Sequence, residues 1–410
     1  MGQVQSKSLD LILHFRSQFL ITLFVLLNLP LFSSSMQSNA FTFYAIIGVN
    51  VLLGLFAIAT RKRVHFPSEG IPFRRILPLI IQGTVQSSVF IYIILMTRSS
   101  ETQSLVLSRI PLIFYQLIFA FIFDYLFIIS RGKVYFPEFY VIPMVMSINL
   151  FLWFSDNYFI FHLVLIVLGI LIKTYVVRNE GNGKSSNIFN PSFIALTLCA
   201  FFVIMFNLHT HIYDIEIATI YDRTPGFDIF VLCAGCFTLW LPNSYVESIG
   251  AYCAIMFVDY LSETFFGYRL LYRLAGGSVM VAIMLGITDP KTSPHSKPGK
   301  FFFGAAFGCS VILINFMMYL FNTAVHDYYS KILSIPILNI FTKKFDEWFG
   351  SLFQFELNYY ASRIVAILIF GTIFFFTYPR LEKETQPTLI HVLADQVRTE
   401  AGFSPVIAKH

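Results

Sequence analysis

Long apolar segments recur along almost the whole chain, and they constrain its fold more than any other feature. A membrane-spanning helix needs about 20 mainly apolar residues, and runs of roughly that length begin near Phe41, Leu77, Leu105 and Phe301. Hydrophobic residues make up 56% of the 410 residues and charged residues 12%, and the mean hydropathy is +0.70. No soluble domain of this length is expected to have such a composition. The sequence therefore predicts an all-α polytopic membrane protein.

We predict about ten to thirteen transmembrane elements, some of them half-helices or re-entrant segments, because several apolar runs are shorter than a full span. The predicted segments are 19–33, 41–60, 77–96, 105–130, 134–154, 158–177, 193–207, 229–241, 249–261, 276–287, 301–321, 332–341 and 364–378. We divide the chain into a membrane domain at 1–346, an extra C-terminal membrane region at 347–378 and a soluble tail at 379–410. Within the tail, the pattern of 387–401 predicts a short amphipathic helix.

Basic residues concentrate in four short loops, at 61–75, 131–133, 178–184 and 291–300. The positive-inside rule places these loops, and with them the N-terminus, in the cytoplasm. The net charge of +5 is carried by such loops, so it bears on orientation in a lipid bilayer, and no nucleic-acid partner is expected. The five cysteines lie in apolar segments, where we expect them to pack and not to form disulfides or bind a metal.

The polar stretch 288–294, which reads Thr-Asp-Pro-Lys-Thr-Ser-Pro, has a residue order that looks specified. A proline disfavours the helical conformation in the residue before it, so we expect Asp289, Ser293 and Lys297 to be extended. The Asp289 side chain is expected to close an Asx turn or to cap the segment after it. The simplest interpretation of this stretch is a cytoplasmic loop between two membrane helices.

The stretch 189–192, which reads Phe-Asn-Pro-Ser, has the same local physics, with a polar residue held extended by the proline after it. Both of these proline-containing turns are predicted at the cytoplasmic face. They indicate that the membrane domain consists of two halves, each with an irregular backbone segment that enters the membrane at a corresponding place. Two unrelated loop turns are the alternative. Gly304 and Gly308, four residues apart, would let the following helix pack closely against a neighbour. The predicted helix-break residues are Asn190, Pro191, Asp289, Pro290, Thr292 and Ser293.

These two stretches resemble the two signature stretches of the RnfD/NqrB family, membrane subunits of ion-translocating ferredoxin:NAD and NADH:quinone oxidoreductases. The family pattern reads approximately Phe-Asn-Pro-Ala in the first half and Thr-Asp-Pro-x-Thr-Ser-Pro in the second. The resemblance is firmest at 173–346 and includes a last shared helix that contains Asn339. It implies about ten spans in two pseudo-symmetric halves, other membrane subunits as partners, and a location in a bacterial inner membrane.

The family resemblance also implies, in its electron-transfer members, an FMN joined through phosphate to a Thr in an outside loop, in a Ser-x-Ala-Thr context. The corresponding loop of this chain keeps Ala218-Thr219 but lacks the Ser and the flanking Gly. Thr219 is therefore the candidate acceptor for FMN in a degenerate motif, and no other cofactor is expected. The same departure is similar to flavin-less relatives of the family, so a flavin-less divergent branch is the alternative.

Asp124 is the most informative polar residue inside a predicted span, because an unpaired carboxylate within a bilayer is costly. It is a candidate for a proton or cation path with Gln116 on a nearby face, and hydrogen bonding within the bundle is the alternative. Glu247, near the end of its span, is expected to reach the membrane interface, and Lys173 is expected to snorkel. No metal site is predicted.

These features favour an RnfD/NqrB-like integral subunit of a redox-linked electron-transport or ion-translocating complex, of flavoprotein-like type. Two alternatives remain open at this stage. One is a cofactor-free solute or ion transporter on the same framework, and the other is a structural subunit of a membrane assembly. The sequence does not assign a catalytic residue or decide whether the chain is an enzyme.

Overall fold

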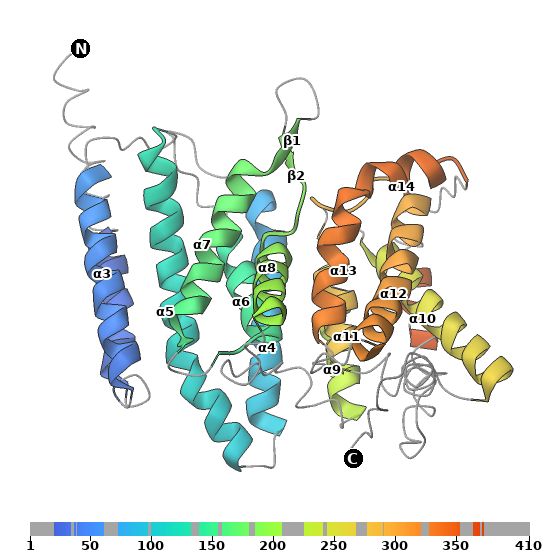
Figure 1. Cartoon of the computed structure of the whole chain (residues 1–410), viewed down its shortest axis with the longest axis horizontal. Coiled ribbons are helices and arrows are strands. Elements are labelled where there is room, and N and C mark those ends of the chain that lie inside the picture. Colours follow the sequence, from blue (N-terminus) through green and yellow to red (C-terminus); the bar gives the residue numbers. More distant parts are fainter. Residues whose placement is uncertain are drawn as a thin grey trace.

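The computed structural model shows an all-α bundle (Figure 1). The structure describes residues 20–33, 37, 39–60, 73–96, 100–132, 139–154, 158–179, 185–206, 225–240, 244–267, 277–289, 291–320, 328–352, 364–369 and 371–372. The first described helix runs over Leu20–Phe32 and ends in the 3-10 segment η1 (Leu29–Phe32). The later elements are α3 (Ala40–Thr60), α4 (Phe73–Met96), α5 (Ser100–Ser130), α6 (Val141–Phe151), α7 (Ile160–Tyr175), β1 (Val177–Asn179), β2 (Ser185–Asn187), α8 (Pro191–Met205), α9 (Pro225–Trp240), α10 (Tyr245–Phe266), α11 (Gly277–Val281), the π-helix η6 (Ala282–Gly286), α12 (Lys297–Leu320), α13 (Tyr328–Ile340) and α14 (Thr342–Phe349).

Five of the described helices are long and apolar enough to cross a membrane. These are Ala40–Thr60, Leu77–Met96, Gln103–Ser130, Tyr245–Phe266 and Lys297–Met318. On α3, apolar side chains such as Tyr44, Leu52 and Ile58 are 62–70% exposed, as expected of a surface covered by lipid. The predicted all-α polytopic membrane fold is confirmed, and the chain is a multi-pass integral membrane protein.

Two buried helices are too short to cross a bilayer. Helix α6 has 11 residues, and η6, which directly continues α11, has 5. At 1.5 Å per residue such elements rise about 16 Å or less, which is roughly half of the ~30 Å hydrocarbon core. Every residue of η6 and every residue of α6 except Ile142 is buried. These elements fit the half-helices that the sequence predicts.

The predicted segment 134–154 is therefore wrong as a continuous span. The backbone leaves the helix at Leu152, which is extended with φ −149° and ψ 126°, and the stretch to Phe154 continues without helical structure. The loop after α7 also differs from the prediction, because its ends pair as an antiparallel hairpin with Val177 opposite Asn187. Strands of three residues are too short to show the alternation by which a strand is recognised in a sequence.

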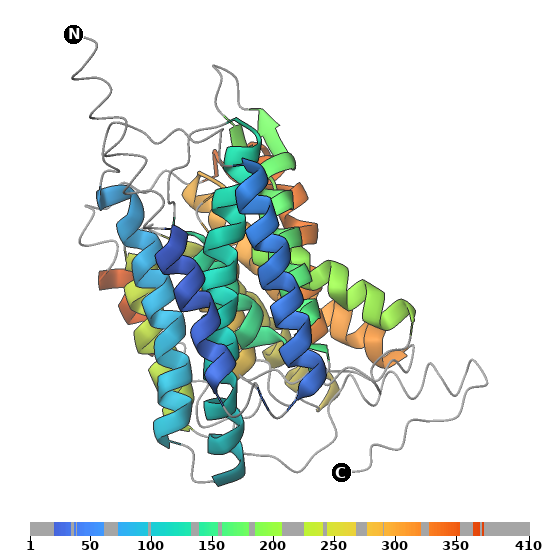
Figure 2. The same ribbon diagram turned by 90° about the vertical axis from the view of Figure 1, so that its left-hand side faces the viewer.

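The elements form two groups along the long axis of the molecule, α3 to α8 and α9 to α14 (Figure 1). Helix α5 contacts both α3 and α4, and the three run side by side across one face (Figure 2). Polar groups tie this face together. The Tyr115 hydroxyl donates to Asn50 Oδ1 at 2.8 Å, and Asn50 Nδ2 donates to Asn28 Oδ1 at 3.0 Å.

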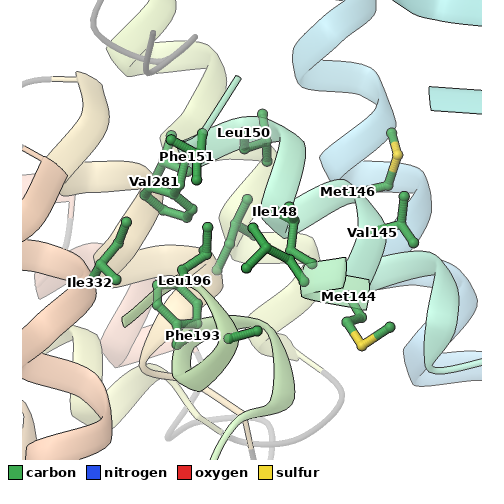
Figure 3. Packing of buried hydrophobic residues seen from close by; sticks show 14 of the residues in the cluster. Met144, Val145, Met146, Ile148, Leu150, Phe151, Phe193, Leu196, Val281 and Ile332 are labelled. Atoms are coloured by element: carbon green, nitrogen blue, oxygen red, sulfur yellow. The ribbon is translucent and has the colours of Figure 1, made fainter. Parts of the chain in front are cut away.

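The two groups share one apolar core, in which α6 and α8 meet α11 and α13 (Figure 3). The ring centroids of Phe151 and Phe193 lie 5.3 Å apart. Gly286, at the end of η6, lies so close to α8 and α13 that an added Cβ would be 2.7 Å from Phe193 Cζ and 3.1 Å from Ile335 Cδ1. A side chain at this position would displace the tips of Phe193 and Ile335, and because Phe193 belongs to the other group, the end of η6 is part of the contact between the halves.

Helical residues occur at 364–369 and 371–372, inside the segment predicted at 364–378. The amphipathic helix predicted at 387–401, like the rest of the tail, lies outside the described residues.

Candidate functional site

The first polar stretch begins α8. Asn190 is the N-cap residue with extended backbone (φ −67°, ψ 121°), and Pro191 follows in the first turn. Asn190 Oδ1 accepts hydrogen bonds from the Ser192 N–H at 3.2 Å and from the Ser192 hydroxyl at 2.8 Å. The cap satisfies N–H groups that a helix start leaves without partners, and the proline replaces one of them. The local physics predicted for this stretch is what the structure shows.

The second polar stretch folds into a compact turn between η6 and α12. Asp289 Oδ1 accepts from the Lys291 N–H at 3.1 Å, which is the predicted Asx turn. The Asp289 carbonyl accepts from the Thr292 N–H at 3.1 Å and from the Ser293 hydroxyl at 2.8 Å. Thr292 and Ser293 are 3% and 2% exposed, so their side chains are buried within the protein. Pro290 lies outside the described residues.

Lys297 differs from its prediction. It is the first residue of α12 and not an extended residue. The physical reason is that Pro298 stands in the first helical turn, where the missing N–H has no intrahelical partner to lose.

Asn339, in the last turn of α13, joins the two stretches. Its Oδ1 accepts from the Asn190 N–H at 3.3 Å, and its Nδ2 donates to the Thr292 carbonyl at 3.1 Å. The Thr342 hydroxyl donates to the same carbonyl at 3.1 Å. Asn339 is 2% exposed. The two stretches therefore meet through one buried amide, which the sequence places in the last shared helix without indicating its role.

Replacing Asn339 by leucine is expected to destabilise the protein by about 1–3 kcal/mol, because it leaves the buried Asn190 N–H without a partner, while the Thr292 carbonyl keeps the Thr342 hydroxyl. The measurement is thermal unfolding of the purified protein in detergent. The control is Thr342→Val, which removes one of two donors to the Thr292 carbonyl and leaves that carbonyl satisfied by Asn339. Equal midpoints for the two variants would contradict the bridging role of Asn339.

Asp346 of α14 holds the end of the second stretch. Its carboxylate accepts from the His295 N–H and the Ser296 N–H, both at 2.8 Å, and from the Ser296 hydroxyl at 2.6 Å. These hydrogen bonds hold the Asp346 carboxylate just before the start of α12. Its negative charge therefore lies at the positive end of that helix. This contact between distant segments has no local sequence signal.

A buried ion pair lies beside the second stretch. Lys300 Nζ, in the first turn of α12, is 3.1 Å from Glu247 Oε1, in the first turn of α10, and the two side chains are 11% and 0% exposed. The Ser293 side chain lies next to the same carboxyl. The expectation that Glu247 reaches the membrane interface is wrong, because α10 and α12 pack so closely that this carboxylate faces the interior.

Glycines allow that close packing. An added Cβ on Gly304 would collide with the Glu247 carbonyl, and one on Gly250 would collide with the Phe301 carbonyl. The small-residue face predicted at Gly304 and Gly308 is confirmed, and its neighbour is α10.

Asp124 is 3% exposed and accepts a hydrogen bond from the Tyr140 hydroxyl at 2.6 Å. Lys173 Nζ lies 3.0 Å from the centroid of the same tyrosine ring, so it packs on that ring and does not simply snorkel.

Burial raises the pKa of the Asp289 carboxyl, while the Lys291 N–H, the Lys291 charge, the Thr292 side chain and the Lys173 charge act in the opposite direction. Lys173 therefore lies within electrostatic reach of the second stretch.

Gln116, which the sequence places on a face near Asp124, is hydrogen-bonded to the short helix α6. Asn149 Nδ2 of α6 donates to Gln116 Oε1 at 2.6 Å, and Gln86 Nε2 of α4 donates to the Ser147 hydroxyl at 2.8 Å. These amides anchor the short helix α6 to its neighbours. Uncompensated polar groups are costly in this setting, so α6 needs such partners.

Thr219, the candidate FMN acceptor, lies outside the described residues. All five cysteines have free thiols. The described part of the chain contains no group of three or more His, Cys, Asp or Glu side chains that could hold a metal ion.

One comparison with known protein families matches part of the chain. Residues 228–353 match the model of the NQR2, RnfD, RnfE family. The matched region includes Glu247, the second polar stretch, Asn339 and Asp346, whereas the first polar stretch precedes it. No curated protein matches the chain.

Proposed function

We propose that this chain is the integral subunit of a redox-linked, ion-translocating membrane complex, because its residues 228–353 match the model of the NQR2, RnfD, RnfE family. One observation carries the proposal. The family's matched region contains the turn at 288–296, and that turn is completed by Asn190 of the other half through the Asn339 amide. The part of the chain that precedes the match is thereby built into the same site.

The arrangement suits the passage of an ion between the halves. Helix α8 starts, and η6 ends, at buried polar turns, so the partial charges of helix termini point into the protein. Irregular backbone at such a depth is tolerated only where protein or an internal path surrounds it. Asp124, Tyr140 and Lys173 form a neighbouring group of ionisable side chains, and the Lys173 charge acts on Asp289 of the second stretch. In this proposal the two halves shift relative to one another around the Asn339 bridge.

The proposal includes a flavin only if Thr219 is its attachment site. FMN, when bound there, would supply one-electron and two-electron transfer chemistry. In this proposal Asp124, Tyr140 and Lys173 line the ion path, and Asn339 joins the two halves. A cytoplasmic N-terminus is part of the same proposal because the basic loops favour that orientation, and a bacterial inner membrane is part of it because the family resemblance implies that location.

The experiment isolates the full chain from its native membranes in mild detergent, together with whatever subunits accompany it. We expect redox-active subunits in the same complex, and ion uptake by proteoliposomes that depends on an electron donor. In-gel fluorescence after denaturation then tests for covalent flavin in the native chain and in Thr219→Ala, with Thr224→Ala as the control in the same loop. Flavin that survives in Thr219→Ala would remove the acceptor role of that residue.

A cofactor-free ion transporter is the second candidate, and the buried Asp124–Tyr140 contact beside Lys173 is the observation that favours it. Ion uptake by proteoliposomes of the chain alone, without donor or accompanying subunits, would support this candidate and contradict the redox-linked proposal.

A further inference from the structure

Helix α14 is held to the protein by one side of its surface. Phe345 is 7% exposed and makes an edge contact with Phe303, with ring centroids 5.6 Å apart. Phe349 stacks on Phe302 at 4.1 Å. Asp346 binds the backbone at His295 and Ser296. These contacts fix the rotation of α14 about its axis, so the direction of its remaining side chains is also fixed.

A second side of α14 exposes aromatic rings with a cation over them. Trp348 is 57% exposed and Phe341 is 36% exposed. Lys344 Nζ lies 5.8 Å from the Phe341 ring centroid and 5.9 Å from that of Trp348. Lys343 is also exposed but is about 100° further round the helix, away from the two rings. Only one of these adjacent lysines therefore shares a surface with the exposed tryptophan.

Helix α13, which directly precedes α14, also exposes apolar side chains. Ile337 and Ile340 of α13 are 46% and 53% exposed, as expected of a face that meets hydrocarbon. Helix α14 follows at the same end of the bundle as the hairpin β1–β2 (Figure 1). A tryptophan and a lysine at the end of an apolar helix face are the pattern of a membrane interface, where the ring stays at the headgroup level and the ammonium reaches the phosphates.

We propose that α14 lies in the headgroup layer of the bilayer and that Lys344, with Trp348 beside it, binds the phosphate of an anionic lipid. The exposed lysines 291, 297 and 343 at the same end give the surrounding surface a charge complementary to anionic headgroups. Because Asp346 is on this helix, the lipid site is joined directly to the turn at 288–296. The proposal does not depend on the redox or ion-transport activity.

The test uses the full chain in nanodiscs of phosphatidylcholine that contain increasing fractions of brominated phosphatidylglycerol or of brominated phosphatidylcholine. The chain has three tryptophans, so the Trp348 signal is obtained as the difference between the native protein and Trp348→Phe. We expect brominated phosphatidylglycerol to quench Trp348 at the lower fraction. Lys344→Gln should lower this preference about fivefold, the factor that corresponds to about 1 kcal/mol for one lysine at an anionic surface.

Lys343→Gln is the matched control, because it removes the same charge from the neighbouring position and leaves the Lys344 ammonium over the rings. It should lower the preference by much less than Lys344→Gln. Equal effects of the two substitutions would overturn the specific site. Trp348 fluorescence that is quenched in nanodiscs by aqueous acrylamide but not by either brominated lipid would overturn the membrane assignment and leave the surface to water or a protein partner.

Discussion

Lys300→Met is expected to destabilise the protein by about 3–5 kcal/mol, because it leaves the Glu247 carboxylate buried without its cation. The carboxylate is 0% exposed, whereas the lysine side chain is 11% exposed. Glu247→Gln should therefore have a smaller effect, since the long lysine side chain can turn its ammonium towards water. Thermal unfolding in detergent and the yield of monodisperse protein measure both variants.

Two further variants sharpen this prediction. The double variant Glu247→Gln/Lys300→Met should recover much of the stability, because it leaves no charge in the interior. Lys343→Met, which removes an exposed lysine, should leave the unfolding midpoint close to that of the native protein. A Lys300→Met protein as stable as Lys343→Met would mean that the 3.1 Å ion pair contributes nothing to the fold.

Gly304→Ala is expected to destabilise the protein by about 1–3 kcal/mol or more, because its new methyl group collides with the Glu247 carbonyl, a backbone atom that cannot move aside alone. Helices α10 and α12 would have to separate, and the Glu247–Lys300 pair would separate with them. The measurement is again the unfolding midpoint, together with the susceptibility of the α10–α12 region to limited proteolysis.

Gly48→Ala in α3 is the matched control for Gly304→Ala. An added Cβ at Gly48 meets nothing within 4 Å, so the same substitution should stabilise its helix slightly through the higher helix propensity of alanine. Opposite signs are therefore expected for one chemical change at two helical glycines. A stabilising effect at both positions would exclude close backbone packing between α10 and α12.

The local features of the candidate site were predictable from the sequence. The Asn190 cap, the Asp289 Asx turn and the small-residue face at Gly304 depend on bonding rules that act within a few residues. At Lys297 two local rules compete: a residue before proline favours extended backbone, but a proline in the first turn of a helix is compatible with helical geometry. The prediction followed the first rule and was wrong.

The contacts between the halves were not predictable in this way. Asn339 is one polar residue in an apolar helix, and nothing near it in the sequence indicates that its amide joins Asn190 to Thr292. Glu247 looked like an interface residue because its span ends nearby, but the approach of α12 encloses it. Each of these contacts requires two segments far apart in the chain to meet at a defined depth.

The amino-acid sequence alone predicts that this chain spans a membrane, that its helices break at two polar turns and that one helix packs closely through glycines. These properties follow from hydrophobic length, proline geometry and side-chain size, which need no partner segment. The tertiary structure alone decided which helix receives Gly304, which amide joins the two turns and which carboxylate Lys300 neutralises. The physical reason is that a buried polar group must find its partner wherever the packing of apolar faces brings one within hydrogen-bonding distance.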